Sequence, residues 1–167
     1  MRVLGIDCGT ECTGYGVVEL RKDHSLTCVV SGAIRLSLRL PLANRLRTIF
    51  DTLQAILRQY EPNDVAIEDV FYAVNVKSAL KLGQVRGVAM LAASSAELPV
   101  FEYSPLSIKS AVAGYGKADK YQVQHMVTEL LKLPSIPEPP DAADALAIAI
   151  CHLHTSATLA RQRAAGS

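Results

Sequence analysis

Apolar and polar residues alternate along the first part of the chain in a pattern that predicts three β-strands. Apolar runs occupy residues 3–7, 15–20 and 26–35, and segments rich in glycine or charged residues separate them. Connections this short join antiparallel strands, because parallel neighbours need a crossover of about a dozen or more residues. We therefore expect this part of the chain to form an antiparallel meander.

Beyond Pro41, segments with helical spacing of apolar residues alternate with short apolar runs. A helix is expected from Pro41 to just before Pro62, since large apolar residues recur there every three or four positions. The later elements are expected as a strand at 64–68, a helix at 76–97, a strand at 100–103, helices at 106–113 and 120–131, a proline-rich loop at 134–140, and a last helix from 141 to about 154. Helical crossovers make the later strands parallel. The pattern predicts an α/β fold with a mixed five-stranded sheet and helices on both faces.

Length and composition fit one domain. The chain has 167 residues, of which 50% are hydrophobic, enough for one core and too few for two large domains. We expect the domain to span residues 1–155 and residues 156–167 to form a mobile tail. No apolar stretch reaches the ~18 residues of a membrane span, and residues 1–7 hold too short an apolar run for a signal peptide. The expected location is therefore cytoplasmic, with the four cysteines as reduced thiols.

Carboxylates stand where three of these predicted elements reach the edge of the sheet. Asp7 and Glu68 end apolar strands, while Asp141 and Asp144 share one face at the start of the last helix. Two carboxylates ~4 Å apart repel each other by roughly 4 kcal/mol at an effective dielectric constant of about 20. No lysine is obviously placed among them, so the cluster is expected to raise at least one pKa and to bind divalent cations. Oxygen ligands favour Mg²⁺ or Mn²⁺.

Helix capping is the alternative explanation for part of this cluster. Acidic residues favour the first turn of a helix, which accounts for one of Asp141 and Asp144. It accounts for neither Asp7 nor Glu68. A soft-metal site at Cys8 and Cys12 is also conceivable, but their spacing matches no zinc pattern.

Basic residues gather in the stretch from 74 to 120, although the net charge of the whole chain is only +1. Six of them stand there against the acids Glu97, Glu102 and Asp119. The six are Lys77, Lys81, Arg86, Lys109, Lys117 and Lys120. A basic surface around an acidic pocket fits a polyanion that is held by its flanks and attacked at its centre. Ordinary solvated surface charges would explain the composition alone equally well.

Five segments, in this order, together resemble the RuvC family of Holliday-junction resolvases. They are residues 5–10 with 13–18, then 66–71, 78–87, 122–127 and 141–149. The similarity covers nearly everything from Val3 to His152. It implies an RNase H-like fold and a homodimer that cuts four-way DNA junctions with Mg²⁺ in recombination and repair, with a branch-migration helicase complex as a partner. Cys8 departs from the family, since many members have proline there.

The resemblance assigns metal-binding roles to the four acids. Phosphodiester hydrolysis can use two divalent ions ~3.5–4 Å apart, which activate water and stabilise the leaving oxygen. Asp7 is expected to bridge two Mg²⁺ ions in each subunit, Glu68 to hold one, and Asp141 with Asp144 to hold the other. Mn²⁺ is expected to substitute for Mg²⁺.

DNA contacts are expected from an aromatic residue and from the basic stretch. The resemblance matches Phe71 to an aromatic that stacks on an unpaired base, although a buried packing role would also suit it. Lys109 and Lys120 match basic family positions that meet phosphates or the charge developing at the cut. The remaining expected contacts are Lys77, Lys81, Arg86 and Lys117. Lys117 has no family match and suits a plain surface position.

Small residues on the helix at 76–97 favour a dimer. This helix is apolar on more than one face, so it can pack on its own sheet and still contact a second copy across a two-fold axis. A wholly buried helix in a monomer is the alternative. The small residues are Gly83, Gly87, Ala89, Ala92, Ala93 and Ala96.

Two other functions deserve comparison. Residues 7–14 also resemble the first phosphate loop of actin-like ATPases and sugar kinases, but the chain has room for only one such domain and has no second glycine-rich phosphate loop. A non-catalytic junction-binding module would be expected to lack one of the acids, and none is missing. The histidines His125, His152 and His154 are not added to the site.

Overall fold

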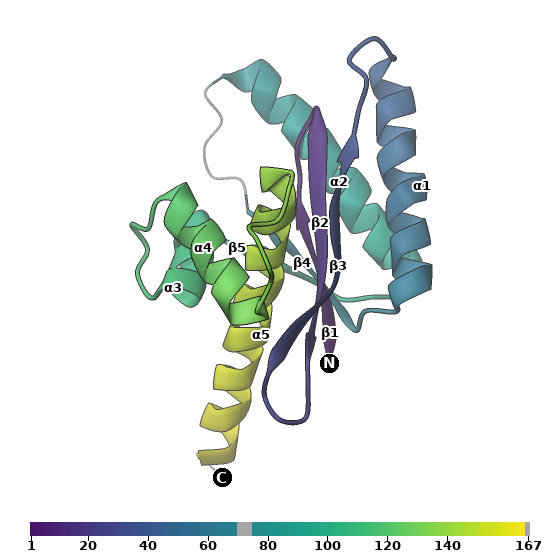
Figure 1. Ribbon diagram of the computed structural model, residues 1–167. Coiled ribbons are helices and arrows are strands. Elements are labelled where there is room, and N and C mark those ends of the chain that lie inside the picture. Colours follow the sequence, from purple (N-terminus) through teal and green to yellow (C-terminus); the bar gives the residue numbers. More distant parts are fainter. Residues whose placement is uncertain (70–74, 166–167) are drawn as a thin grey trace.

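A mixed five-stranded sheet forms the centre of the molecule (Figure 1). The computed structural model describes residues 1–69 and 75–165, with side-chain surroundings as far as residue 158. The strands are β1 (Arg2–Asp7), β2 (Cys12–Leu20), β3 (Leu26–Arg35), β4 (Asp64–Glu68) and β5 (Val100–Tyr103). Their order is β3-β2-β1-β4-β5, with β1, β2 and β3 antiparallel and β1, β4 and β5 parallel. The predicted α/β architecture is confirmed.

Helices cover both faces of this sheet, as Figure 1 shows. The helices are α1 (Leu42–Tyr60), α2 (Val76–Ser95), α3 (Pro105–Ala113), α4 (Lys120–Leu131) and α5 (Pro140–Ala165). One hydrophobic core joins α1 and α2 to one face, and a second joins α3, α4 and α5 to the other. Because side chains alternate along a strand, Val3 of β1 packs in the α5 core, while its neighbour Leu4 packs in the α1 core.

Glycines let α5 lie directly on the central strands. A side chain added at Gly5 of β1 would collide with the backbone carbonyl of Ala145, and one added at Gly14 of β2 would collide with that of Asp141. Only glycine permits such close backbone approach. The acidic start of α5 is thereby held against the strand end that carries Asp7, since Asp7 and Gly14 are register partners.

Element ends differ from the sequence expectation by one or two residues at several places, and the larger differences concern β2 and α5. The strand β2 begins at Cys12 rather than at residue 15, because Cys12 still pairs with Arg35 of β3. The last helix was expected to end near His154 but continues to Ala165, so that expectation was wrong. Pro140 is the first residue of α5, which is compatible with proline because the first turn needs no backbone donor.

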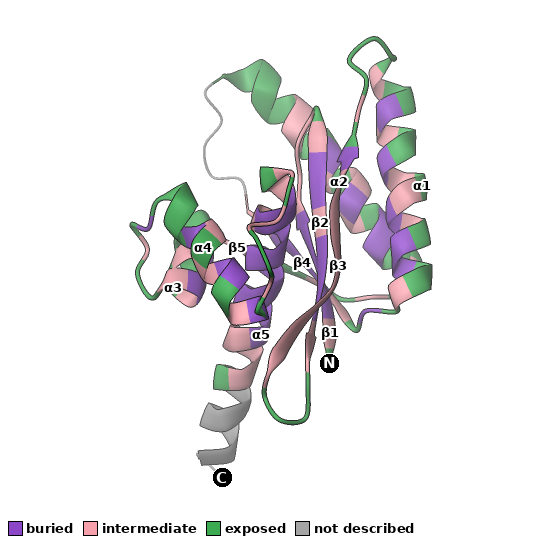
Figure 2. Ribbon diagram, viewed as in Figure 1, coloured by how far each residue is buried: buried purple, intermediate pink, exposed green. Residues whose placement is uncertain are grey.

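Burial follows the layers, but α2 is covered unevenly (Figure 2). Val85, Ala89, Ala92 and Ala93 pack into the core, whereas the N-terminal turns of α2 are exposed. This helix is therefore not wholly buried in a single chain. None of the helices in the described part of the chain has the length and apolar character required to cross a membrane.

Candidate active site

Three elements bring the four predicted acids to one end of the sheet. Asp7 and Glu68 are the last residues of the neighbouring parallel strands β1 and β4, whose register pairs Ile6 with Ile67. Asp141 and Asp144 lie in the first two turns of α5, where the backbone of Asp141 packs against Gly14 of β2. Apolar strands ending in acids and a helix starting with acids therefore converge, as the sequence pattern indicated.

One pocket collects most of the predicted catalytic residues. It has a volume of about 240 Å³, and Asp7, Glu68, Asp144, Lys109 and Lys120 line it together with apolar residues of α3, α4 and α5. Asp141 does not line this pocket. It lines a neighbouring hollow that also includes Cys12 of β2.

Asp7 has the most perturbed carboxyl group of the site. Burial is the largest cause, and the charges of Asp144, Glu68 and Asp141 add to it, so that the pKa of Asp7 rises to about 7. The sequence argument expected a raised pKa from mutual repulsion alone. The structure adds desolvation as the stronger cause, because the end of β1 is covered by α5.

Glu68 responds to the same surroundings more weakly. Burial raises its pKa first and the charge of Asp144 raises it further, whereas Lys109 and Lys120 lower it. The two lysines, which line the same pocket, thus act electrostatically on the acids. A site of this kind stabilises added positive charge near the acids and added negative charge near the lysines.

Lys120 forms a direct ion pair within the acidic cluster. Its Nζ donates a hydrogen bond to Oδ2 of Asp144 at 2.7 Å, and this bond is the main cause of the raised pKa of Lys120. The expectation that no lysine lies among the acids was therefore wrong. Lys120 and Asp144 are far apart in the sequence, and only the packing of α4 on α5 brings them together.

The donor set fits a hard divalent cation in its chemistry. All four acids offer oxygen ligands, and the raised pKa of Asp7 reflects negative potential that a cation would relieve. The structure describes the side chains of residues 1–69 and 75–158. Among these, no three His, Cys, Asp or Glu side chains are arranged as a group that could hold one metal ion. Lys120 occupies one oxygen of Asp144.

Comparison with known proteins identifies the family. The family model described as "Crossover junction endodeoxyribonuclease RuvC" matches residues 3–152. The chain belongs to the RuvC family. A RuvC relative from Koribacter versatilis, named crossover junction endodeoxyribonuclease, is 63% identical over 164 residues, covering 98% of this chain and 99% of the relative. The expected nuclease class is confirmed with it.

Solved RuvC structures agree with the fold described above. The structure of Thermus thermophilus RuvC has a TM-score of 0.87 and 33% identity, covering 95% of this chain and 96% of that chain. A second structure, of T. thermophilus RuvC in complex with Holliday junction substrate, has the same TM-score with 31% identity and equal coverage. The match to RuvC favours a resolvase over the ATPase-like alternative.

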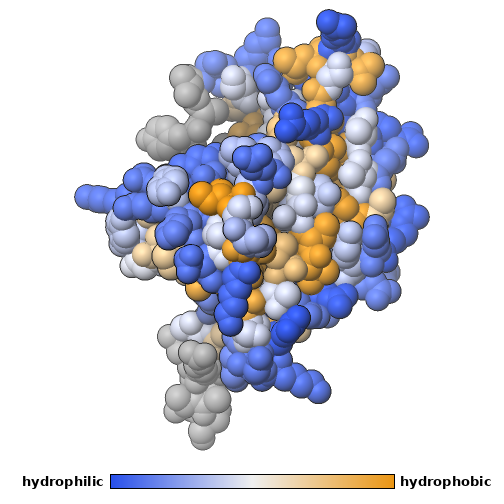
Figure 3. All heavy atoms as spheres, viewed as in Figure 1, coloured by the Kyte–Doolittle hydropathy of each residue, from blue (hydrophilic) through white to orange (hydrophobic). Residues whose placement is uncertain are grey.

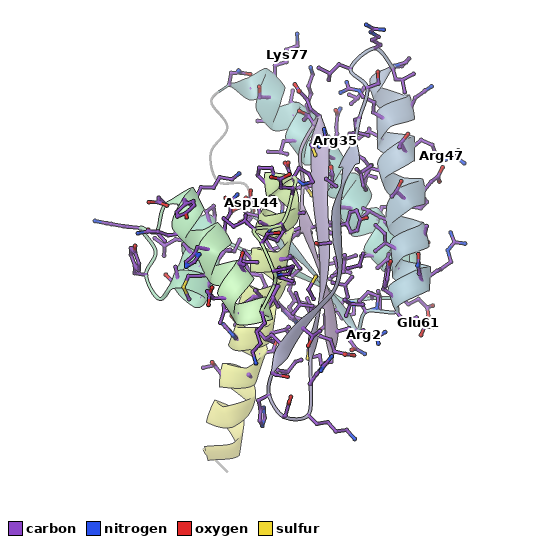
Figure 4. The ribbon with its side chains drawn as sticks, viewed as in Figure 1. Arg2, Arg35, Arg47, Glu61, Lys77 and Asp144 are labelled. Atoms are coloured by element: carbon purple, nitrogen blue, oxygen red, sulfur yellow. The ribbon has the colours of Figure 1, made fainter. Side chains whose placement is uncertain are left out.

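The other lysines that were predicted to contact DNA differ in their exposure. Lys77 and Lys117 are exposed, and Lys81 is partly exposed. Figure 4 places Lys77 at the same end of the molecule as Asp144. Their DNA contacts stay predictions, as does that of Phe71, which lies outside the described residues.

Arg86 is engaged within the chain. Its guanidinium forms an ion pair with Glu102 and lies 3.6 Å from the carboxylate of Asp69, and its side chain is only 16% exposed. These contacts connect α2 to β5 and to the residue that follows β4. Arg86 therefore has a structural role here, and its predicted DNA contact would require it to leave these partners.

Sequence reasoning missed a basic residue at this end of the RuvC fold. Arg35 ends β3 opposite Cys12 and lines the same hollow as Asp141. Figure 4 places Arg35 at the same end of the molecule as Asp144. The available signal was its position, since Arg35, like Asp7, is a charged residue that ends an apolar strand.

Proposed function

We propose that this chain resolves four-way DNA junctions by paired, metal-dependent phosphodiester hydrolysis. The observation that carries the proposal is the pocket in which acids of β1, β4 and α5 face lysines of α3 and α4. Such a pocket offers oxygen ligands for cations and positive charge for a phosphate. Membership of the RuvC family and the likeness to a RuvC structure that contains a Holliday junction support the choice of substrate.

Asp7, Glu68, Asp141 and Asp144 would hold two Mg²⁺ ions in each subunit, and Mn²⁺ would substitute. When bound, the ions supply an activated water and stabilise the leaving oxygen. Asp7 suits a bridging role, because the charges of all three other acids act on it. Its neutral form is substantially populated near pH 7, so metal binding requires it to release a proton.

Lys109 and Lys120 would act on the phosphate. Both line the same pocket as Asp7 and Glu68, where the charge on the phosphate oxygens would increase during hydrolysis. Lys120 would leave Asp144 to do so. Exposed Lys77 and Lys117 would add contacts to the DNA backbone, which position the junction without reading its sequence.

A two-fold dimer through α2 would supply two active sites for the two equivalent strands of a junction. The exposed side of α2 carries Leu80, Gly83, Gly87 and Leu91, which recur at helical spacing and form a continuous stripe. Leu80 is 64% exposed and Leu91 57% exposed in the single chain. Burial of this stripe against a second copy would remove the apolar surface from water. The branch-migration helicase complex would then act on the same junction.

The test is cleavage of a mobile four-way junction and of a linear duplex of matched sequence, in Mg²⁺ or in EDTA. Nicked duplex products from the junction alone, and only with Mg²⁺, are expected. Asp7→Asn, Glu68→Gln, Asp141→Asn and Asp144→Asn should each lower the cleavage rate by about a hundredfold or more while junction binding persists. Equal cutting of linear and branched DNA would refute the junction selectivity, and activity in two of the four variants would refute the ligand assignment.

A further inference from the structure

A second hollow lies directly beside the proposed catalytic pocket. It has a volume of about 580 Å³, and the start of β2, the loop after β3 and the segment before α5 line it. Asp141 contributes to its wall, whereas Asp144, one turn later on α5, lines the catalytic pocket. The two spaces therefore meet at the first turn of α5.

Two arginines in this hollow have no ion-pair partner among the residues that the structure describes. Arg35 and Arg39 line it and are exposed, and neither forms an ion pair with the part of the chain that the structure describes. Arg86 differs from them, because it forms ion pairs with Asp69 and Glu102. Unpaired arginines in a concave surface suit phosphate groups, whose oxygens match the fork of the guanidinium.

The loop that carries Arg39 is held in place and presents apolar side chains. The backbone N–H of Leu36 donates to the carbonyl of Glu11 at 2.9 Å, and that of Leu40 donates to the carbonyl of Ser37 at 3.1 Å. Leu38 is 59% exposed and Leu40 46% exposed. In Figure 3, apolar surface lies beside strongly hydrophilic side chains at the β3–α1 connection. Apolar groups beside arginines suit a nucleotide chain, which offers base faces and sugars as well as phosphates.

We infer that this hollow binds the DNA strand next to the cut. Arg35 and Arg39 contact the phosphates that adjoin the cleaved one, and Leu38 packs against a sugar or base. A strand that enters the catalytic pocket reaches the hollow by passing the first turn of α5. The inference rests on the proposed function and adds a binding site to it, one that lies outside the basic stretch of residues 74–120.

Two acids also line the hollow and oppose a phosphate. Asp141 is one of the proposed metal ligands, so its charge is offset when metal is bound. Glu11 is exposed and remains as the opposing charge. Replacing it provides a test in the opposite direction, because Glu11→Gln should tighten junction binding while loss of the arginines weakens it.

The first experiment measures junction binding by the full-length protein in EDTA over a series of salt concentrations. Arg35→Ala/Arg39→Ala should bind about tenfold more weakly, and the slope of log K against log salt should fall by ~1.5, or about 0.7–0.9 for each lost phosphate contact. Arg35→Lys/Arg39→Lys should retain most of the slope. Arg47→Ala/Arg58→Ala is the matched control, because it removes two exposed arginines from α1 (Figure 4 shows Arg47), and it should leave the slope unchanged.

The second experiment locates the contact on the DNA. Neutral methylphosphonates are placed singly at the phosphates that flank the cut made by the wild type. Wild-type binding should weaken about tenfold at one or two of these positions, and Arg35→Ala/Arg39→Ala should be nearly insensitive there, because the partner is already gone. Melting of all variants should match the wild type, since the replaced side chains are exposed.

The outcomes separate the two proposals. A wild type that cuts no junction overturns the proposed function. The inference alone is overturned if the wild type cuts junctions but Arg35→Ala/Arg39→Ala keeps the wild-type affinity, salt slope and methylphosphonate pattern. Tighter binding by Glu11→Gln supports the inference, and weaker binding contradicts it.

Discussion

Lys120 and Asp144 form an ion pair in the wall of the proposed catalytic pocket, with 2.7 Å between Nζ and Oδ2. Lys120 is the first residue of α4, and a capping box between Asp119 and Gln122 fixes the helix start. The ammonium group therefore lies where a metal ion would share the same carboxylate. Lys120 is thus a counter-ion of Asp144 within the chain.

Removing this counter-ion should strengthen metal binding. Lys120→Met frees Asp144 and removes a positive charge, so Mn²⁺ measured by calorimetry should bind about fivefold more tightly, while junction cleavage falls. Lys109→Met is the control, because Lys109 lines the same pocket but pairs with no acid within the described residues. Its effect on Mn²⁺ affinity should be smaller. Unchanged or weaker Mn²⁺ binding by Lys120→Met would show that the two cations do not compete.

The exposed stripe of α2 predicts where the chain dimerises. Gly87 has open space around it, so Gly87→Arg fits the single chain but places a charge in the proposed two-fold interface. Sedimentation should detect monomers that bind junctions weakly and make no paired cuts. Ala55→Arg, on the exposed side of α1, should remain dimeric. An unchanged dimer for Gly87→Arg would place the interface elsewhere.

The glycine contact between β2 and α5 predicts a stability effect. Gly14→Ala introduces a Cβ that collides with the carbonyl of Asp141, so α5 must shift and the free energy of unfolding should fall by about 1–3 kcal/mol. Gln59→Ala is the control, because Gln59 is exposed on α1 and alanine favours a helix. Urea unfolding should therefore show a loss of stability for Gly14→Ala and little change for Gln59→Ala. Equal effects would mean that the α5 contact at Gly14 is not tight.

The sequence could predict elements and their order because local patterns determine them. Asp7 and Glu68 were found because each ends an apolar strand, and parallel strand ends meet at one edge of a sheet. The ion pair of Lys120, and the presence of Asp141 in a separate hollow, depend on how helices pack. No local pattern encodes those distances. The extra length of α5 was missed because its last turns have no apolar periodicity.

The raised pKa of Asp7 predicts that replacing its carboxyl group gives a protein that is inactive but more stable. An unfolded aspartate loses its proton near pH 3.8, but folded Asp7 holds its proton until about pH 7. Between these values the unfolded state releases a proton that the folded state keeps, so the folded wild type loses stability as pH rises from about 4 to 7. Above pH 7 the loss is complete. The difference of about three pKa units sets an upper limit near 4 kcal/mol.

Asp7→Asn removes this charge at similar volume. In EDTA at pH 8, its free energy of unfolding should exceed that of the wild type by about 1–3 kcal/mol, less than the limit because burying the polar amide of asparagine also has a cost. Toward pH 5 the difference should shrink, since wild-type Asp7 is then protonated. Millimolar Mg²⁺ should shrink it too, because the ion binds the intact acids better and stabilises the wild type by mass action.

Asp51→Asn provides the control for this last prediction. Asp51 is an exposed carboxylate paired with Arg47 on α1, so its removal should give no gain in stability at any pH. Chemical unfolding of the three proteins at pH 5 and pH 8, with EDTA or Mg²⁺, tests every step of the argument. If Asp7→Asn is less stable than the wild type in EDTA at pH 8, structural hydrogen bonds hold Asp7 and outweigh its burial and the neighbouring charges. If the gain in the free energy of unfolding is the same at pH 5 as at pH 8, the ionisation of Asp7 is not its cause.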